Sequence, residues 1–282
     1  MKILYISPEN TVGTLSVWKQ FHESNNNSCE FITFYKTPNG FDSGLCLNLP
    51  FISTGLFYRK LRKLYYRKKY GENGEYSIKP GNPPVWIRKS WLEKKYFSIR
   101  DWLWNKNIKK KLAHLNLLDF DVYHFEWGLD FDRSCSLSQQ ISNMGKPIIC
   151  TYHGQDLRTR GVIEPLNSLS DKNFTSELDL LSMHPKIEYM FLPIAFNDTQ
   201  SIKKTKKQIK ICHSPTNRYY KGSKQIIKIC EQVANQYSHV EFILIEGVPN
   251  EKVIGIKRTC DILIDQVGNC GGWGYGMNSI EA

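Results

Sequence analysis

An α/β fold built on doubly wound parallel sheets is the class that this sequence of 282 residues predicts. Short apolar runs alternate with segments of helical length, as they do in consecutive βαβ units. The runs are almost continuously apolar, which is typical of strands buried on both faces of a parallel sheet. A second series of the same kind follows a basic, polar stretch at 199–207. Because roughly 100–200 residues make one domain, we predict two domains.

The first domain is expected to span residues 1–200. Its strand candidates are short apolar runs at 3–6, 31–35, 122–125, 147–151 and 189–192. The opening run is too short for a signal peptide and has no cleavage site, so it is interpreted as the first strand.

An insertion at about 38–118 interrupts this domain. Residues 38–90 are rich in Gly and Pro and carry a basic run at 59–69. Ser90 and Glu93 form a capping box, which predicts the start of a helix. The helix would carry an apolar stripe made of Leu92, Tyr96, Ile99 and Leu103, flanked by Trp102 and Trp104. Its carboxyl end would be basic, with Lys109, Lys110 and Lys111. Such a segment could contact an anionic membrane or stack on nucleic acid, but a solvated face over buried tryptophans is the commoner arrangement.

The second domain is expected at 207–282, after a linker near 196–208. Its strand candidates lie at 209–213, 240–245 and 261–264, and a helix is predicted from Ser223 to Tyr237. Three strands are few for a stable core, so we expect this domain to be incomplete.

The composition favours an anionic partner. The formal net charge is +11, which suits nucleic acid, an acidic membrane surface or phosphorylated small molecules. No recognised nucleic-acid motif occurs, so no nucleic-acid partner is expected. The eight cysteines form no C-x-x-C pair, which indicates reduced thiols and no structural metal. No run approaches a membrane span. We expect a cytoplasmic chain, with peripheral attachment to the inner face of the cell membrane as an open alternative.

Three polar segments follow strands of the first domain, where the carboxyl ends of parallel strands line a ligand crevice. Gly13 and Thr14 open a helix after the first strand, and the amides of such a turn can hold phosphate, although a simple tight turn is favoured. His153, Asp156 and Arg158 follow a later strand and could bind a sugar or phosphate, although a local Asp–Arg pair is equally consistent. Glu126 stands beside Trp127, a pairing that suits carbohydrate, but a core Trp with a solvated Glu is slightly favoured.

Two further segments follow strands of the second domain. Arg218 and Lys221 could clamp a diphosphate, by a guanidinium fork and a point charge respectively, ahead of a helix whose start also favours anions. The alternative is an exposed basic turn. The glycine-rich segment 271–276 precedes another helix, in which Glu281 could accept hydrogen bonds from a ribose diol. Here the alternative is a flexible loop with a surface Glu.

The order of these motifs resembles that of the GT-B glycosyltransferases of the family 4 (group 1) type. His213-Ser214-Pro215-Thr216-Asn217-Arg218 with Lys221-Gly222 is similar to the family's H-A-P-T-x-R…K-G segment. Asp261 to Gln266, then Gly274-Tyr275-Gly276 and Ile280-Glu281-Ala282, resemble A-D-I-x-x-D-Q…G-x-x-G-x-x-x-x-E-A. His153 to Arg158 resembles H-G-x-D-x-R. The resemblance covers most of the chain and is weak over 38–118.

The resemblance implies a GT-B-like fold of two Rossmann-like domains, with the acceptor in the first and a UDP- or GDP-linked sugar donor in the second. Arg218 and Lys221 would neutralise the donor diphosphate, and His153 would contact donor sugar or acceptor; these three are the implied catalytic residues. The implied donor-binding residues are Gly13, Thr14, Asn217, Gly274, Tyr275, Gly276 and Glu281. The acceptor-side candidates are Glu126, Asp156 and Arg158. Neither a metal nor another cofactor is expected.

The function expected from the resemblance is transfer of a hexose, with retention, to a polysaccharide or lipid-linked acceptor. Two departures qualify it. Trp273 stands where the family often has an acidic residue, and the family continues beyond the segment that ends here at Ala282. We therefore expect a chain truncated at its carboxyl end. The alternative function is a catalytically impaired relic that acts as a membrane- or glycan-binding module.

Overall fold

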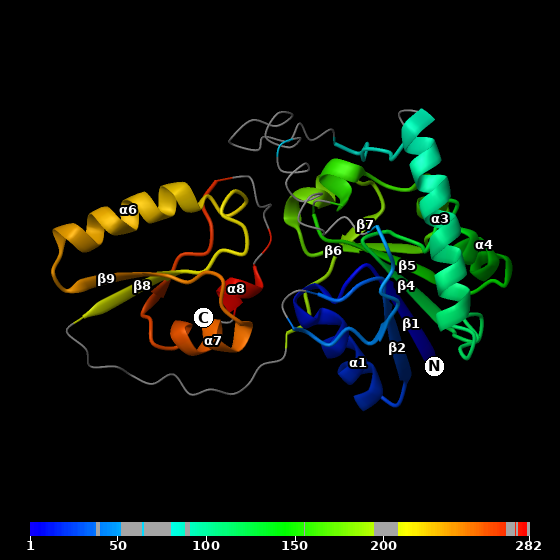
Figure 1. The fold of residues 1–282 in the computed structure, drawn as a ribbon, viewed down its shortest axis with the longest axis horizontal. Helices are drawn as coiled ribbons and strands as arrows, with labels where there is room; N and C mark the ends of the chain where they lie inside the picture. Colours follow the sequence, from blue (N-terminus) through cyan, green and yellow to red (C-terminus); the bar gives the residue numbers. More distant parts are fainter. Residues whose placement is uncertain are drawn as a thin grey trace. The chain divides into compact units, whose positions relative to one another are not determined.

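The computed structural model describes residues 1–37, 40–51, 64, 80–87, 91–154, 156–194, 208–268, 274 and 276–280. The described residues form two compact units (Figure 1). Unit 1 consists of the described residues up to 194 except Leu64, and unit 2 consists of those from 208 onward. The predicted linker lies outside the described residues except for Gln208, and the predicted domain boundaries stay a prediction.

Unit 1 is built on a seven-stranded sheet in the order β3-β2-β1-β4-β5-β6-β7. All its neighbouring strands pair in parallel. The strands are β1 (Lys2–Ser7), β2 (Ser28–Thr33), β3 (Leu45–Cys46), β4 (Val122–Glu126), β5 (Ile148–Tyr152), β6 (Lys172–Thr175) and β7 (Ile187–Tyr189).

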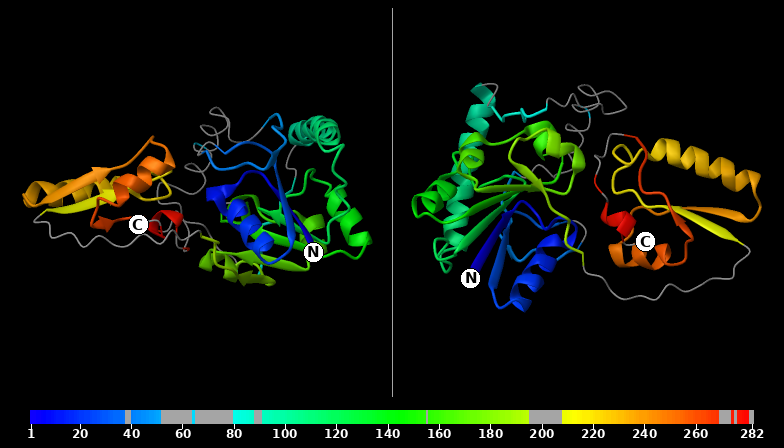
Figure 2. Two further views of the ribbon diagram at one scale, coloured as in Figure 1. Left: turned by 90° about the horizontal axis from the view of Figure 1, so that it is seen from below. Right: turned by 180° about the vertical axis from the view of Figure 1, so that it is seen from behind.

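Helices cover both faces of this sheet, because side chains alternate along each strand. Leu4 and Ile6 share a core with Trp104 and Ile108 of the long helix α3, whereas Tyr5 packs with Leu15 of α1 on the other face (Figure 2). The helical elements of unit 1 are η1 (Thr11–Gly13), α1 (Thr14–Ser24), α3 (Trp91–Lys111), α4 (Ser136–Asn143), the π-helical turn η2 (Asp156–Arg160), α5 (Glu164–Leu169) and the 3-10 turn η3 (Leu178–Ser182).

Helix α3 turns the predicted apolar stripe toward solvent. Leu92 is 70% exposed and Ile99 is 53% exposed. The buried face carries Arg100, Trp104 and Ile108 instead. The Arg100 guanidinium lies over the Trp104 ring, 4.3 Å from its centroid, and pairs with Asp101 at 2.5 Å. An arginine whose charge is neutralised and whose guanidinium stacks on an aromatic ring can occupy a core position.

Unit 2 has a parallel three-stranded sheet in the order β10-β8-β9. Figure 1 shows α6 and α7 on opposite sides of it. Its elements are β8 (Ile209–His213), α6 (Ser223–Gln236), β9 (Val240–Leu244), α7 (Asn250–Lys257), β10 (Ile262–Leu263) and the short helix α8 (Met277–Ile280). The two parallel sheets confirm the predicted α/β class with Rossmann-like domains, while the incompleteness of the second domain stays a prediction.

The backbone at the start of α6 is closely packed against the segment that follows β10. Gly222 has φ +64, and a Cβ there would lie 2.4 Å from the Val267 carbonyl oxygen; Gly247 has φ +69 and open space around it. We expect Gly247→Ala to lower the free energy of unfolding by roughly 1–2 kcal/mol, from left-handed strain alone. Gly222→Ala should cost clearly more, because the carbonyl must also move.

Urea unfolding monitored by circular dichroism measures both costs. Gly255→Ala, within α7 and without a close neighbour, is the control, and it should stabilise by about 0.5–1 kcal/mol. Equal costs for Gly222→Ala and Gly247→Ala would contradict the packing described.

Candidate functional site

The polar segments of unit 1 collect at one edge of its sheet. Strands β1, β4, β5 and β6 run in parallel, so the segments that follow them emerge on the same side. The indole Nε1 of Trp127, just after β4, donates to Thr11 Oγ1 at 3.2 Å, which joins the turn after β1 to the turn after β4.

The turn around Gly13 is held by its own hydrogen bonds. Gly13 has φ +80 and precedes α1. The amide of Thr14 donates to the Thr11 carbonyl, and the amide of Leu15 donates to Asn10 Oδ1 at 2.9 Å. Two of the amides at the start of α1 thus have internal acceptors, and a phosphate there would have to share or replace them.

A carboxylate and an imidazole meet at the ends of β4 and β5. Glu126, only 4% exposed, accepts a short hydrogen bond from His153 Nε2. Burial by itself would lower the pKa of His153, but the charge and hydrogen bond of Glu126 outweigh it and raise that pKa. Burial would likewise raise the pKa of Glu126, yet His153 lowers it. The two groups therefore favour a buried ion pair.

A second imidazole, that of His124, lies beside the same carboxylate. His124 Nε2 lies 3.5 Å from Glu126 Oε1 and 2.6 Å from Thr151 Oγ1, and its ring stacks on Tyr5 at 4.6 Å between centroids. Burial lowers the pKa of His124 to about 4, despite the opposing charge of Glu126. His124 is therefore neutral at neutral pH, whereas the raised pKa of His153 favours its cationic form.

Arg158 belongs to a buried network. Its guanidinium donates to both carboxylate oxygens of Asp179, at 2.7 and 2.6 Å, and to Glu177 at 2.9 Å. Asp156 accepts from the amides of His153 and Leu157, so its side chain closes the π-helical turn. The acceptor-side candidates are thus brought together at this edge, but each of the three is buried and has a partner within the chain.

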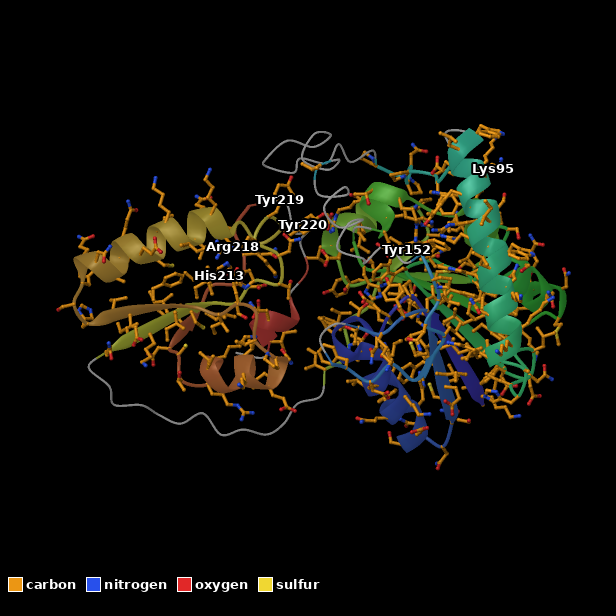
Figure 3. All side chains as sticks on the ribbon, in the orientation of Figure 1. Lys95, Tyr152, His213, Arg218, Tyr219 and Tyr220 are labelled. Carbon is orange, nitrogen blue, oxygen red and sulfur yellow. The ribbon has the colours of Figure 1, made fainter. Side chains whose placement is uncertain are left out.

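Unit 2 presents Arg218 on the segment between β8 and α6, next to Tyr219 and Tyr220 (Figure 3). Its Nε and Nη2 donate to the two oxygens of Glu246 at 2.8 and 2.5 Å. The neighbouring Asn217 accepts from the Tyr219 amide at 3.0 Å, which shapes the turn. The fork geometry expected for a phosphate is present, but a carboxylate fills it.

Lys221 is paired at the end of β10. Its Nζ lies 2.7 and 2.8 Å from the oxygens of Asp265, and Asn278 Nδ2 donates to Asp265 at 2.7 Å. Burial would raise the pKa of Asp265, but these hydrogen bonds hold it below the usual value. A Cβ on Gly276 would come within 2.7 Å of Asp265 Oδ2, so the backbone approaches this ion pair closely.

His213 fixes the base of the same cluster. Its Nδ1 lies 2.7 Å from the Ile264 carbonyl oxygen, which only accepts, so the ring proton is on Nδ1. Nε2 then accepts from the Ser223 hydroxyl at 2.7 Å. Burial lowers the pKa of His213, in keeping with a neutral ring that joins β8, β10 and the start of α6.

Several predicted site residues lie outside the described residues, namely Tyr275 and Glu281, together with Trp273. Gly274 and Gly276 are described, and Gly276 lies against the Lys221–Asp265 pair. In the part of the chain that the structure describes, no group of three His, Cys, Asp or Glu side chains could hold a metal ion, and no helix is long and apolar enough to cross a membrane.

The acidic partners of the cations are the site residues that sequence reasoning did not assign. Glu246, Asp265, Glu177 and Asp179 stand 19 to 44 residues from the cations they pair with. Their signal in the sequence is position, because each closely follows a strand: Glu246 follows β9, Asp265 follows β10, and the other two follow β6.

No protein-family model matches the chain, and no curated protein matches it. Among solved structures the chain is similar to a putative UDP-N-acetylglucosamine 2-epimerase from Listeria monocytogenes, with 7% identity, a TM-score of 0.42 and coverage of 99% of this chain and 70% of that one. It is similar to the glycotransferase of kitacinnamycin, with 10% identity, a TM-score of 0.45 and coverage of 96% and 76%. For MurG of Acinetobacter baumannii the identity is 11%, the TM-score 0.40 and the coverage 95% and 68%. Similarities this distant do not define an activity.

The ion pair of unit 1 predicts a titration behaviour. We expect Glu126→Gln to lower the pKa of His153, since the amide removes the opposing charge and leaves burial to dominate. Ring resonances of His153 followed by NMR over pH report this pKa, and Glu231→Gln, on the exposed side of α6, is the control. An unchanged His153 titration would contradict the pairing.

The same pair predicts a pH window of stability. Because the pKa of His153 is raised in the folded protein, protonated His153 stabilises the fold at pH values below its ordinary pKa of 6.5. This stabilisation is lost as the pH rises through the pKa of His153 in the folded protein. Because the pKa of Glu126 is lowered in the folded protein, ionised Glu126 stabilises the fold at pH values above its ordinary pKa of 4.5. This stabilisation is lost as the pH falls through the pKa of Glu126 in the folded protein. The difference in unfolding free energy between wild type and Glu126→Gln should therefore be largest between pH 4.5 and 6.5.

Proposed function

We propose that this chain is a glycosyltransferase that moves a sugar from a nucleotide-sugar donor to a polysaccharide or lipid-linked acceptor in cell-surface glycan biosynthesis. One observation carries the proposal: Arg218 and Lys221 both follow β8 at the start of α6, and Gly276 lies against Lys221. Cations there, beside a helix start, suit the diphosphate of such a donor.

The reaction needs positive charge most when the glycosidic bond breaks. Negative charge then builds on the leaving nucleotide diphosphate, so cations that face it stabilise the transition state more than the ground state. Arg218 supplies a planar fork that can bind two phosphate oxygens, and Lys221 supplies a point charge. The hexosyl donor, its UDP or GDP carrier and retention of configuration rest on the sequence resemblance.

His153 is the proposed contact to the sugar or acceptor in unit 1. Glu126 fixes Nε2, and among the described residues no hydrogen-bond partner is found for Nδ1. A protonated imidazole held in this way presents one N–H donor in a fixed direction. Because Glu126 and Arg158 are occupied by partners in the chain, we propose positioning roles for them rather than direct contact with the acceptor.

Removing the Arg218 guanidinium tests the proposal. We expect Arg218→Ala to lower turnover of a nucleotide sugar on the order of 10²-fold, the effect of losing one preorganised transition-state contact. Release of the nucleotide measures turnover, with a panel of UDP- and GDP-linked sugars as donors. Lys228→Ala, an exposed residue of α6, is the control. If neither binding nor turnover of any donor is found and Arg218→Ala changes nothing, the proposal fails.

We further propose that unit 1 attaches peripherally to an anionic membrane through α3. The exposed side of α3 carries Trp91 and Trp102, 68% and 65% exposed, beside Leu92 and Ile99. Lys95 projects from this helix, with its Nζ 4.8 Å above the Trp91 ring (Figure 3). The exposed positions of α3 include five lysines and neither Asp nor Glu, and interfacial tryptophans beside lysines suit an acidic bilayer surface.

Flotation with vesicles tests this attachment. Vesicles rich in phosphatidylglycerol should carry the protein and neutral phosphatidylcholine vesicles should not. The double change Lys109→Gln and Lys110→Gln should weaken binding on the order of tenfold or more, since each surface lysine is worth about 1 kcal/mol. The matched change Lys224→Gln and Lys228→Gln on α6 should have little effect. Equal loss in both double variants would indicate net charge rather than α3.

A further inference from the structure

The two cations of unit 2 have counter-ions of different kinds. Asp265 is anchored, because Lys221 binds both its oxygens, Asn278 donates to it and the Gly276 backbone packs against it. The side chains of Lys221 and Asp265 are only 16% and 12% exposed. Releasing this carboxylate would strand a largely buried charge, so the pair behaves as a fixed part of the fold.

Glu246 is held much more loosely. Within the described residues, its carboxylate has one hydrogen-bonding partner, Arg218, and the two side chains are 31% and 58% exposed. It follows β9 and precedes Gly247, where the chain has φ +69 and open space. An exposed ion pair of this kind contributes little to stability, so Glu246 can turn into solvent at small cost.

A diphosphate would compete with Glu246 for the same guanidinium fork. The diphosphate and the Glu246 carboxylate both present paired oxygens to the Arg218 guanidinium. The diphosphate carries more negative charge than a single carboxylate. A ligand must therefore gain more from Arg218 than the carboxylate does.

We propose that Glu246 is a displaceable counter-ion that occupies Arg218 in the free protein and that a diphosphate ligand takes its place on the guanidinium. This inference rests on the proposed function for the site it refines. Lys221 keeps its ion pair with Asp265 while it contributes its charge to the site, so Arg218 is the cation that changes partner on binding.

Calorimetric titration with UDP, UMP and inorganic pyrophosphate tests the exchange. We expect Glu246→Gln to bind UDP and pyrophosphate about two- to fivefold more tightly than wild type, the range that an exposed ion pair allows. Its affinity for UMP should rise by a similar factor, because each ligand that takes the Arg218 fork displaces the same carboxylate. Glu251→Gln, an exposed acid of α7, should bind like wild type. Adding Glu246→Gln to Arg218→Ala should bring no gain, because the fork is then absent.

Unchanged or weaker UDP binding by Glu246→Gln overturns the inference, as does a gain that persists without Arg218. A Glu246→Gln variant that melts well below wild type and binds no better would show a structural pair instead. The two proposals separate by readout. If pyrophosphate binds as expected but no nucleotide sugar is turned over, only the proposed transferase activity is contradicted. If a nucleotide sugar is turned over but Glu246→Gln binds the ligands like wild type, only the displacement of Glu246 is contradicted. A wild type that binds none of the three ligands contradicts both.

Discussion

The common direction of the strands is the constraint on which both polar clusters depend. Because neighbouring strands are parallel, every segment that leaves a strand at its carboxyl end enters the same edge of the sheet. Residues far apart in sequence, such as Glu126 and His153, or Lys221 and Asp265, meet there as direct neighbours. An antiparallel arrangement of the same strands would send alternate segments to opposite edges and separate each of these pairs.

Neutralisation of charge within the chain is the second theme of both units. Arg158 is buried and binds two acids, and its loss would remove the cation that balances their charge in a region of low dielectric. Arg218 and Glu246 are largely in contact with water, where their attraction is screened and the pair is easily exchanged. Burial therefore decides which arginine serves the fold and which can serve a ligand.

The sequence predicted most of the strands because β1, β4, β5, β8 and β9 are apolar runs. It did not predict β6, whose residues Lys172–Thr175 include one large apolar side chain and hold buried polar groups. It did not identify the buried face of α3, since periodicity does not anticipate an arginine stacked on aromatic rings. The cations of the site could be found from their place after β8. Their acidic partners could not, because no local pattern connects residues separated by 28 or 44 positions.

The register between β4 and β5 makes some parts of this chain freer to change in evolution than others. Glu126 is opposite Thr151, so its side chain reaches His153 just beyond the end of β5. The exposed turn at 143–145, in the connection between the two strands, can lengthen or shorten without altering that pairing, whereas the buried residues of α4 cannot shift freely. Inserting a single residue inside either strand would turn the following side chains to the other face of the sheet. Length variation among related sequences should therefore accumulate in that turn and be rare within the strands.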